Sequence, residues 1–168
     1  MKKQKISFVN QQKKIKVHLS TVHMVKQCIH KVLEVEGLLD IPHEVSVTFV
    51  CNPQIRRINR EFRQVDRATD VLSFPVLEYD ENYRPIYGEG DLDLNENGAV
   101  MLGDIVISLE RCHEQAEEFG HSTRREIAYL TVHSMYHLLG YDHMEEEEKK
   151  LMRSKEEHVL SLMGITRE

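Results

Sequence analysis

Three histidines stand within eleven residues, at His133, His137 and His143 of the segment HSMYHLLGYDH. The apolar run before them predicts a helix, so His133 and His137, four residues apart, would project from one helix face. Gly140 would end this helix and let His143 approach the pair from another direction. Three neutral imidazoles can bind Zn²⁺ and leave one tetrahedral position open, which is typical of a catalytic site.

Chance is the alternative explanation of this spacing, because the chain contains ten histidines. An apolar helix is, however, a costly place for two unpaired imidazoles, and coordination of a metal removes that cost. No cysteine lies nearby in the sequence to close the fourth position, so a catalytic site is favoured over a structural one. The other seven histidines show no such grouping, and we interpret them as surface or core residues: His18, His23, His30, His43, His113, His121 and His158.

The spacing also invites comparison with the zincin peptidase pattern HExxH, in which a glutamate beside the first histidine is the general base. That neighbour is Ser134 in this chain. The metal scaffold looks similar, but the acid–base machinery of the peptidases is missing. The sequence does not identify another general base.

Arg63 is the second candidate functional residue. It belongs to a cluster with Arg56, Arg57, Arg60 and Arg67. A guanidinium offers a planar fork to two phosphate oxygens and can stabilise charge that develops in a transition state. From the residues alone, Arg63 could equally be a solvated arginine at a helix end, while its neighbours indicate a basic rim.

The elements that must position these residues follow from periodicity and capping. We predict strands at 4–11, 44–50, 70–77 and 102–108, and helices at 20–37, 52–63, 108–119, 123–139 and 145–163. This order indicates an α+β fold: a single domain over residues 1–168, with a four-stranded mixed sheet packed with about five helices and a zincin-like metal site.

Three local expectations accompany this fold. The helix at 52–63 should bury Ile55, Ile58 and Phe62, and the last helix should bury Leu151, Val159 and Leu162, because these residues recur at helical spacing. The acidic segment 78–99 has no periodicity and should be a long surface loop. Asp104 stands in a strand, where a lone carboxylate is costly, so we expect it to orient an arginine or a ligand histidine.

Composition limits the protein class. No apolar run approaches the ~18 residues that a membrane span needs, and the basic N-terminus lacks the apolar core of a secretory signal. The three cysteines are odd in number and scattered, which indicates reduced thiols in a cytosolic protein. The net charge of −6 argues against a nucleic-acid partner, although the arginine cluster allows a local basic face.

The segment HSMYHLLGYDH resembles the signature of the YbeY family of bacterial rRNA maturation endoribonucleases. His133, His137, Gly140 and His143 fit the family pattern, and Tyr136 stands where leucine is usual. Two further stretches, NREFRQVDRATDVLSFP and LGDIVIS, also resemble the family and follow in the expected order.

The resemblance implies a zinc-dependent, single-strand-specific endoribonuclease that acts in maturation of the 16S rRNA 3′ end and in ribosome quality control. It implies an α+β fold with the three histidines at the floor of a cleft, and it makes Arg63 the match of a functionally important arginine. We therefore predict that His133, His137 and His143 bind one Zn²⁺ per chain, and that Arg63 and His137 are catalytic.

The implied partners are single-stranded ribosomal RNA, the small ribosomal subunit and its assembly factors, in the cytoplasm, with neither membrane nor DNA. Two alternatives stay open. One is a zincin-like metallohydrolase or peptidase, and the other is a non-enzymatic ribosome-assembly factor whose metal is structural.

Overall fold

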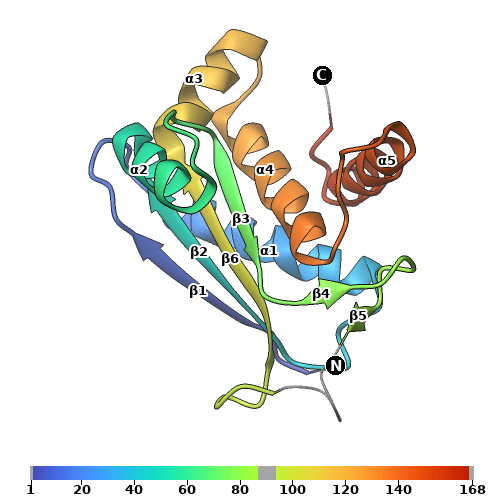
Figure 1. Cartoon of the computed structure of the whole chain (residues 1–168). Coiled ribbons are helices and arrows are strands. Elements are labelled where there is room, and N and C mark those ends of the chain that lie inside the picture. The colour runs from blue at the N-terminus through green and yellow to red at the C-terminus, as the bar shows by residue number, and fades with distance from the viewer. Residues whose placement is uncertain (1, 87–93, 167–168) are drawn as a thin grey trace.

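The computed structural model describes residues 2–86 and 94–166, and six strands and five helices lie in this part of the chain (Figure 1). The strands are β1 (Lys5–Asn10), β2 (His43–Val50), β3 (Val71–Pro75), β4 (Glu78–Tyr79), β5 (Pro85–Ile86) and β6 (Val100–Ser108). The helices are α1 (Leu19–Val35), α2 (Asn52–Arg63), α3 (Leu109–Phe119), α4 (Thr123–Leu138) and α5 (Glu146–Leu162). None of these helices is both long and apolar enough to cross a lipid bilayer.

Four of the strands form one mixed sheet in the order β1-β2-β6-β3. The pairs β1–β2 and β2–β6 are parallel, and β3 runs antiparallel to β6. The helix α1 connects β1 to β2, because parallel neighbours need a crossover connection. The predicted α+β fold, with its four-stranded mixed sheet and five helices in a single domain, is confirmed.

The sheet separates two apolar cores because alternate residues of a strand point to opposite faces. Ile105 and Ile107 of β6 belong to the larger core, which α1, α3, α4 and α5 complete. Val106, between them, belongs to a smaller core with Leu72 of β3 and Ile55 of α2. The helix α2 therefore covers the sheet face opposite to α4.

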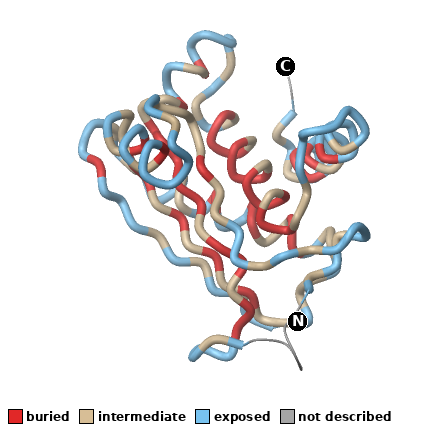
Figure 2. The backbone as a smooth tube through the Cα atoms, viewed as in Figure 1, coloured by how far each residue is buried: buried red, intermediate tan, exposed pale blue. Residues whose placement is uncertain are grey.

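The helix α4 is the structural centre of the domain. It packs against α1, α3 and α5 as well as against β3 and β6, and Figure 2 shows it as an almost continuously buried helix. Within residues 130–140 the half-buried positions are His133, His137 and Gly140, and their neighbours are buried. The histidines thus occupy the one stripe of this helical segment that reaches the surface, on a support that tight packing holds rigid.

Three predicted core residues are exposed instead. Phe62 is 63% exposed near the end of α2, where its ring meets Phe74 edge to face at 5.4 Å. Leu151 and Leu162 are 39% and 55% exposed. The buried stripe of α5 is Met152, Glu156, Val159 and Leu160, so the prediction placed two residues just outside the correct stripe.

The expectation of a structureless loop at 78–99 is wrong for its first part. The strands β4 and β5 form an antiparallel hairpin whose turn is closed by Asp80, which accepts hydrogen bonds from the backbone N–H groups of Asn82 and Arg84. After the gap, the amide of Asn95 donates to the carbonyl of Ala99 in a further turn. Residues 87–93 of the expected loop lie outside the described residues.

Candidate metal centre

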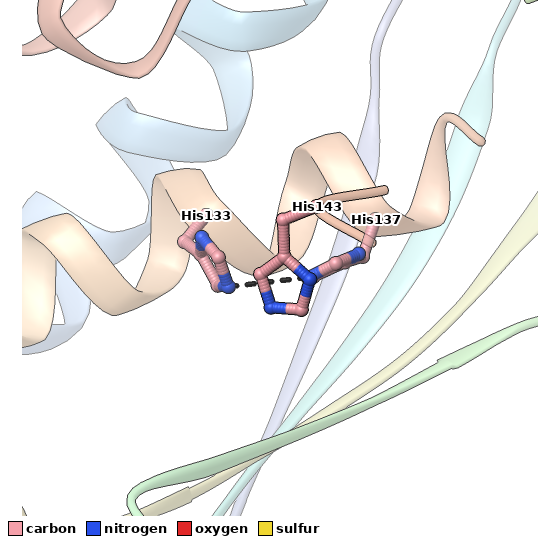
Figure 3. A group of neighbouring side chains, drawn as sticks. All are labelled: His133, His137 and His143. Carbon is pink, nitrogen blue, oxygen red and sulfur yellow. Dashed lines mark hydrogen bonds between the residues drawn. The ribbon is translucent and has the colours of Figure 1, made fainter. Parts of the chain in front are cut away.

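The three predicted histidines converge on one point (Figure 3). His133 and His137 project side by side from α4, and His143 returns to them from the segment that follows the helix. One ring nitrogen from each residue lies within 4.8 Å of the others, and the Nε2 atoms of His133 and His137 are 3.1 Å apart. The structure therefore brings together all three predicted metal ligands.

Hydrogen bonds to the far ring nitrogens determine the tautomers of two rings. The Nδ1 atom of His137 lies 2.9 Å from the backbone oxygen of Tyr141, which can only accept, so Nδ1 carries the proton. The Nδ1 atom of His133 lies 2.9 Å from Oε1 of Glu156, and a carboxylate likewise accepts. Both Nε2 atoms consequently present lone pairs to the space between the rings.

This arrangement fits a bound cation. Two facing lone pairs at 3.1 Å do not form a hydrogen bond unless one ring gains a second proton. Burial, reinforced by the neighbouring His133 and His143, lowers the pKa of His137 to about 4, so its ring is neutral near pH 7. Two imidazole nitrogens bound to one tetrahedral Zn²⁺ at about 2.0 Å would lie about 3.3 Å apart, close to the observed separation.

The turn that delivers His143 is held by the hairpin β4–β5. Gly140 has φ +92°, and a Cβ at this position would lie 2.4 Å from Cγ of the Tyr79 ring, so only glycine fits without displacement. The Tyr79 hydroxyl donates a hydrogen bond of 2.7 Å to the Leu138 carbonyl at the end of α4. Tyr83 stacks on Tyr141 with ring centroids 4.0 Å apart. The hairpin thus packs directly against the turn between the second and third histidines.

His143 is the most accessible of the three rings, with half of its side chain exposed. The Oδ1 atom of Asp142 accepts a hydrogen bond from the His143 backbone N–H at 2.7 Å and lies 3.3 Å from its Nδ1 atom. This carboxylate both shapes the turn and orients the third ring. The cluster therefore has a buried side, formed by α4, and an open side at His143.

The open side faces a cleft of about 840 Å³. One wall is β3 with the residues just before it, a second is the hairpin, and the third carries the three histidines. Arg63, at the C-terminal end of α2, also lines this cleft. Although α2 covers the opposite face of the sheet, its last residue reaches around the edge strand β3 to the histidine side.

The other arginines of the cluster lie elsewhere. Arg56, Arg57, Arg60 and Arg67 line a separate hollow, so they do not form a rim around the histidine cleft. The expectation for Asp104 is also wrong. This carboxylate accepts a hydrogen bond from the Ser46 hydroxyl on the adjacent strand. Among the described residues, it forms no hydrogen bond with an arginine or with a ligand histidine.

Sequence reasoning missed Glu156, which holds His133, and Tyr79, which packs on the turn. Glu156 lies 23 residues after its partner in a helix that contains several other glutamates, so its residue type alone does not separate it from solvated carboxylates. The helical spacing of Glu156 from Met152 and Val159 is the signal that could have found it. A glutamate on the same helix face as these two apolar residues points into the protein.

Comparisons with known proteins identify the family of this chain. The family described as Endoribonuclease YbeY matches residues 7–164. A Clostridium botulinum (strain 657) protein named Endoribonuclease YbeY is 47% identical over 165 residues, covering 94% of this chain and 97% of the relative. A protein of the same name from Clostridium acetobutylicum is 50% identical over 162 residues, with the same two coverages.

A solved structure shows the same fold. The solution structure of a Thermotoga maritima protein superposes with a TM-score of 0.56 at 23% identity, covering 96% of this chain and 92% of the other. The family match spans residues 7–164, which is the part of this chain that holds Arg63 and the three histidines. This chain belongs to the YbeY endoribonuclease family.

Proposed function

We propose that this protein is a zinc-dependent endoribonuclease that cleaves single-stranded RNA. The observation that carries the proposal is the cleft in which three converging histidines and Arg63 face the same space. Its relatives are named endoribonucleases, a class that hydrolyses phosphodiester bonds of RNA. A phosphodiester is an anion, and this cleft combines a site for a cation with a guanidinium.

The chain's own residues have separate roles in this proposal. His133, His137 and His143 would hold the metal, and Glu156 and the Tyr141 carbonyl keep two of these rings in the ligating tautomer. When bound, Zn²⁺ supplies Lewis acidity and lowers the pKa of water. Arg63 would hold the scissile phosphate by a bidentate contact and stabilise the negative charge that grows on its oxygens.

Arg63 is free to take this role. It is exposed, and within residues 2–86 and 94–166 its side chain has neither a salt bridge nor a hydrogen bond. Arg56, by contrast, is held by Asp66 through two hydrogen bonds. A guanidinium without an internal partner, at the wall of a cleft, can bind a phosphate without first breaking an ion pair.

The two alternative functions receive less support. A structural metal is normally enclosed by four protein ligands, whereas this cluster has three histidines and opens into a cleft. A peptidase of the HExxH type needs a carboxylate beside the first histidine, and here Ser134 is fully buried, with a hydroxyl that lacks a hydrogen-bond partner among the described residues.

The shape of the site supports the proposed preference for unpaired RNA. The histidines share a cleft of about 840 Å³ with β3 and the β4–β5 hairpin, so the scissile phosphate and its neighbours must enter this cleft. A flexible single strand can splay its bases to enter, whereas a paired strand must first separate from its complement. In the cell, we propose that the substrate is the 3′ end of 16S rRNA on the small ribosomal subunit, in the cytoplasm.

The test is cleavage by the purified protein of an end-labelled single-stranded RNA and of the same sequence annealed to its complement. We expect internal cleavage of the single strand and little cleavage of the duplex. His137→Ala should be inactive, and His113→Ala should serve as the matched control, since His113 is an exposed histidine on α3. Equal cleavage by both variants would show that the activity does not come from this cleft.

A further inference from the structure

A second hollow, of about 680 Å³, lies beside α2 and is distinct from the histidine cleft. Five cationic side chains line it, together with the two carboxylates of Asp66 and Glu110; the cations are Lys14, Arg56, Arg57, Arg60 and Arg67. The whole chain carries a net charge of −6. A local excess of positive charge in an acidic protein attracts anionic partners to this one surface.

The two carboxylates of the hollow already have partners. Asp66 accepts hydrogen bonds from Nε and Nη2 of Arg56 at 3.0 and 3.2 Å, and it lies 4.0 Å from Arg60. Glu110 lies 3.1 Å from Nζ of Lys14 and also accepts from the Asn52 backbone.

Arg57 and Arg67 are the cations of the hollow that lack an ion-pair partner in the described part of the chain. Both are exposed.

One face of α2 runs from the hollow to the histidine cleft. Arg56, Arg60 and Arg63 are spaced four and three residues apart on α2, so they share one helix face, and Arg56 and Arg63 are separated by about 10 Å along the axis. Arg56 and Arg60 line the hollow, and Arg63 lines the histidine cleft. The loop after α2 repeats this arrangement, because Arg67 faces the hollow and Thr69 faces the cleft.

We infer that this hollow binds the phosphodiester backbone of the single-stranded RNA segment that lies next to the scissile one. The inference rests on the proposed function and extends it from the cleavage point to a longer binding track. The strand would leave the cleft at Arg63, follow the arginine face of α2 and place its phosphates between Arg57 and Arg67.

RNA fits the hollow better than an acidic protein does. Binding between proteins relies on apolar and aromatic side chains that become buried at the centre of the interface. Among the described residues, the apolar lining of this hollow consists of Pro53, Ala68 and the stems of its charged side chains. Guanidinium groups match phosphate geometry, and a row of them along a helix suits a repeating polyanion.

The test compares Arg57→Ala/Arg67→Ala with wild type on two single-stranded RNAs, of about 4 and about 16 nucleotides, which bracket the site sizes of single-strand-binding proteins. Both side chains are exposed, and neither has an ion-pair partner among the described residues, so the melting temperature should not change. The matched control is Lys3→Ala/Lys5→Ala, which removes two charges where β1 begins, at the opposite end of the sheet from α2 (Figure 1).

Binding is measured by fluorescence anisotropy with metal-free protein, and KM and kcat with metal-loaded protein. For the long RNA, we expect the double variant to bind roughly tenfold more weakly than wild type. The slope of log affinity against log salt concentration should become less steep by about 1.4, the value for two lost phosphate contacts. KM should rise and kcat should not change. The short RNA and the lysine control should behave as wild type does.

Three results would overturn the inference: unchanged affinity for the long RNA, an equal loss for both lengths, or an equal loss in the lysine control. Unchanged RNA binding with reduced binding of polyglutamate would assign the hollow to an acidic protein instead. If wild-type protein cleaves neither RNA, the proposed function fails, while the anisotropy series still decides whether the hollow binds the longer strand.

Discussion

The Oε1 atom of Glu156 lies 2.9 Å from Nδ1 of His133, and the Glu156 side chain is only 4% exposed. The two residues belong to different helices, α5 and α4, so this contact ties the last described helix to the histidine cluster. A buried carboxylate that accepts the Nδ1 proton fixes both the tautomer and the orientation of the ring. His133 is therefore prepared to ligate through Nε2.

Glu156→Gln should weaken metal binding on the order of tenfold, the low end of the range for loss of a partner that orients a ligand. The amide keeps the size of the side chain and loses the negative charge that makes His133 a better ligand. Competition of the protein with a chromophoric chelator measures the change. Glu157→Gln, at the exposed neighbouring position, should keep wild-type affinity, and equal affinities of all three proteins would refute the role of Glu156.

Gly140→Ala should lower the free energy of unfolding by about 2 kcal/mol or more and also weaken metal binding. The cause is the combination of a positive φ with a Cβ that would overlap the Tyr79 ring. Gly120→Ala is the control, because Gly120 has φ +71° with no atom within 4 Å of the added Cβ. It should cost about 1 kcal/mol in backbone strain and leave metal affinity unchanged. Urea unfolding and chelator competition separate the two effects.

Stability of the metal-free protein should fall as the pH is lowered from about 6.5 to about 4. The pKa of His137 is lowered from 6.5 to about 4 by burial, so the unfolded chain takes up a proton in this window before the folded chain does. The contribution of His137 to the free energy of unfolding is present above its pKa in the unfolded chain. This contribution is lost as the pH falls towards the pKa of His137 in the folded protein. Urea midpoints of chelator-treated wild type should depend on pH more steeply than those of His137→Gln, and parallel curves would contradict this.

Arg63→Ala should reduce the single-turnover cleavage rate of a single-stranded RNA on the order of a hundredfold, with enzyme in excess and RNA saturated. Metal content should not change, because Arg63 lines the cleft without contacting the histidines through any described hydrogen bond. Arg153→Ala, an exposed arginine on α5, is the control for loss of one positive charge. If Arg63→Ala cleaves saturating RNA at the wild-type rate, Arg63 contributes to RNA binding and not to the cleavage step.

Local sequence signals predicted the sheet, the five helices and the histidine cluster because these features depend on short-range spacing. His133 and His137 share a helix face whatever surrounds them, and Gly140 ends the helix by its own conformation. The position of Arg63 in the cleft came from family resemblance, since α2 covers the opposite sheet face and no spacing rule shows that its end passes the edge strand.

The features that sequence reasoning missed depend on contacts between distant segments. Glu156 meets His133 across two helices, and Tyr79 packs on Gly140 across 61 residues of chain. The hairpin has strands of only two residues each, too short for alternation to be visible. Phe62 was expected in the core because it follows the apolar spacing of α2, yet it is 63% exposed near the end of the helix, where its ring meets Phe74.

The most direct test of metal-dependent RNA cleavage is a metal titration. The protein is stripped with a chelator, dialysed and reloaded with Zn²⁺, while cleavage of a single-stranded RNA is followed. We expect the stripped protein to remain folded by circular dichroism and to be inactive. Activity should then rise linearly and stop rising at one Zn²⁺ per chain, while His143→Ala recovers no activity at that ratio. Full cleavage by the stripped protein, or a stripped protein that is unfolded, would contradict a catalytic metal centre at His133, His137 and His143.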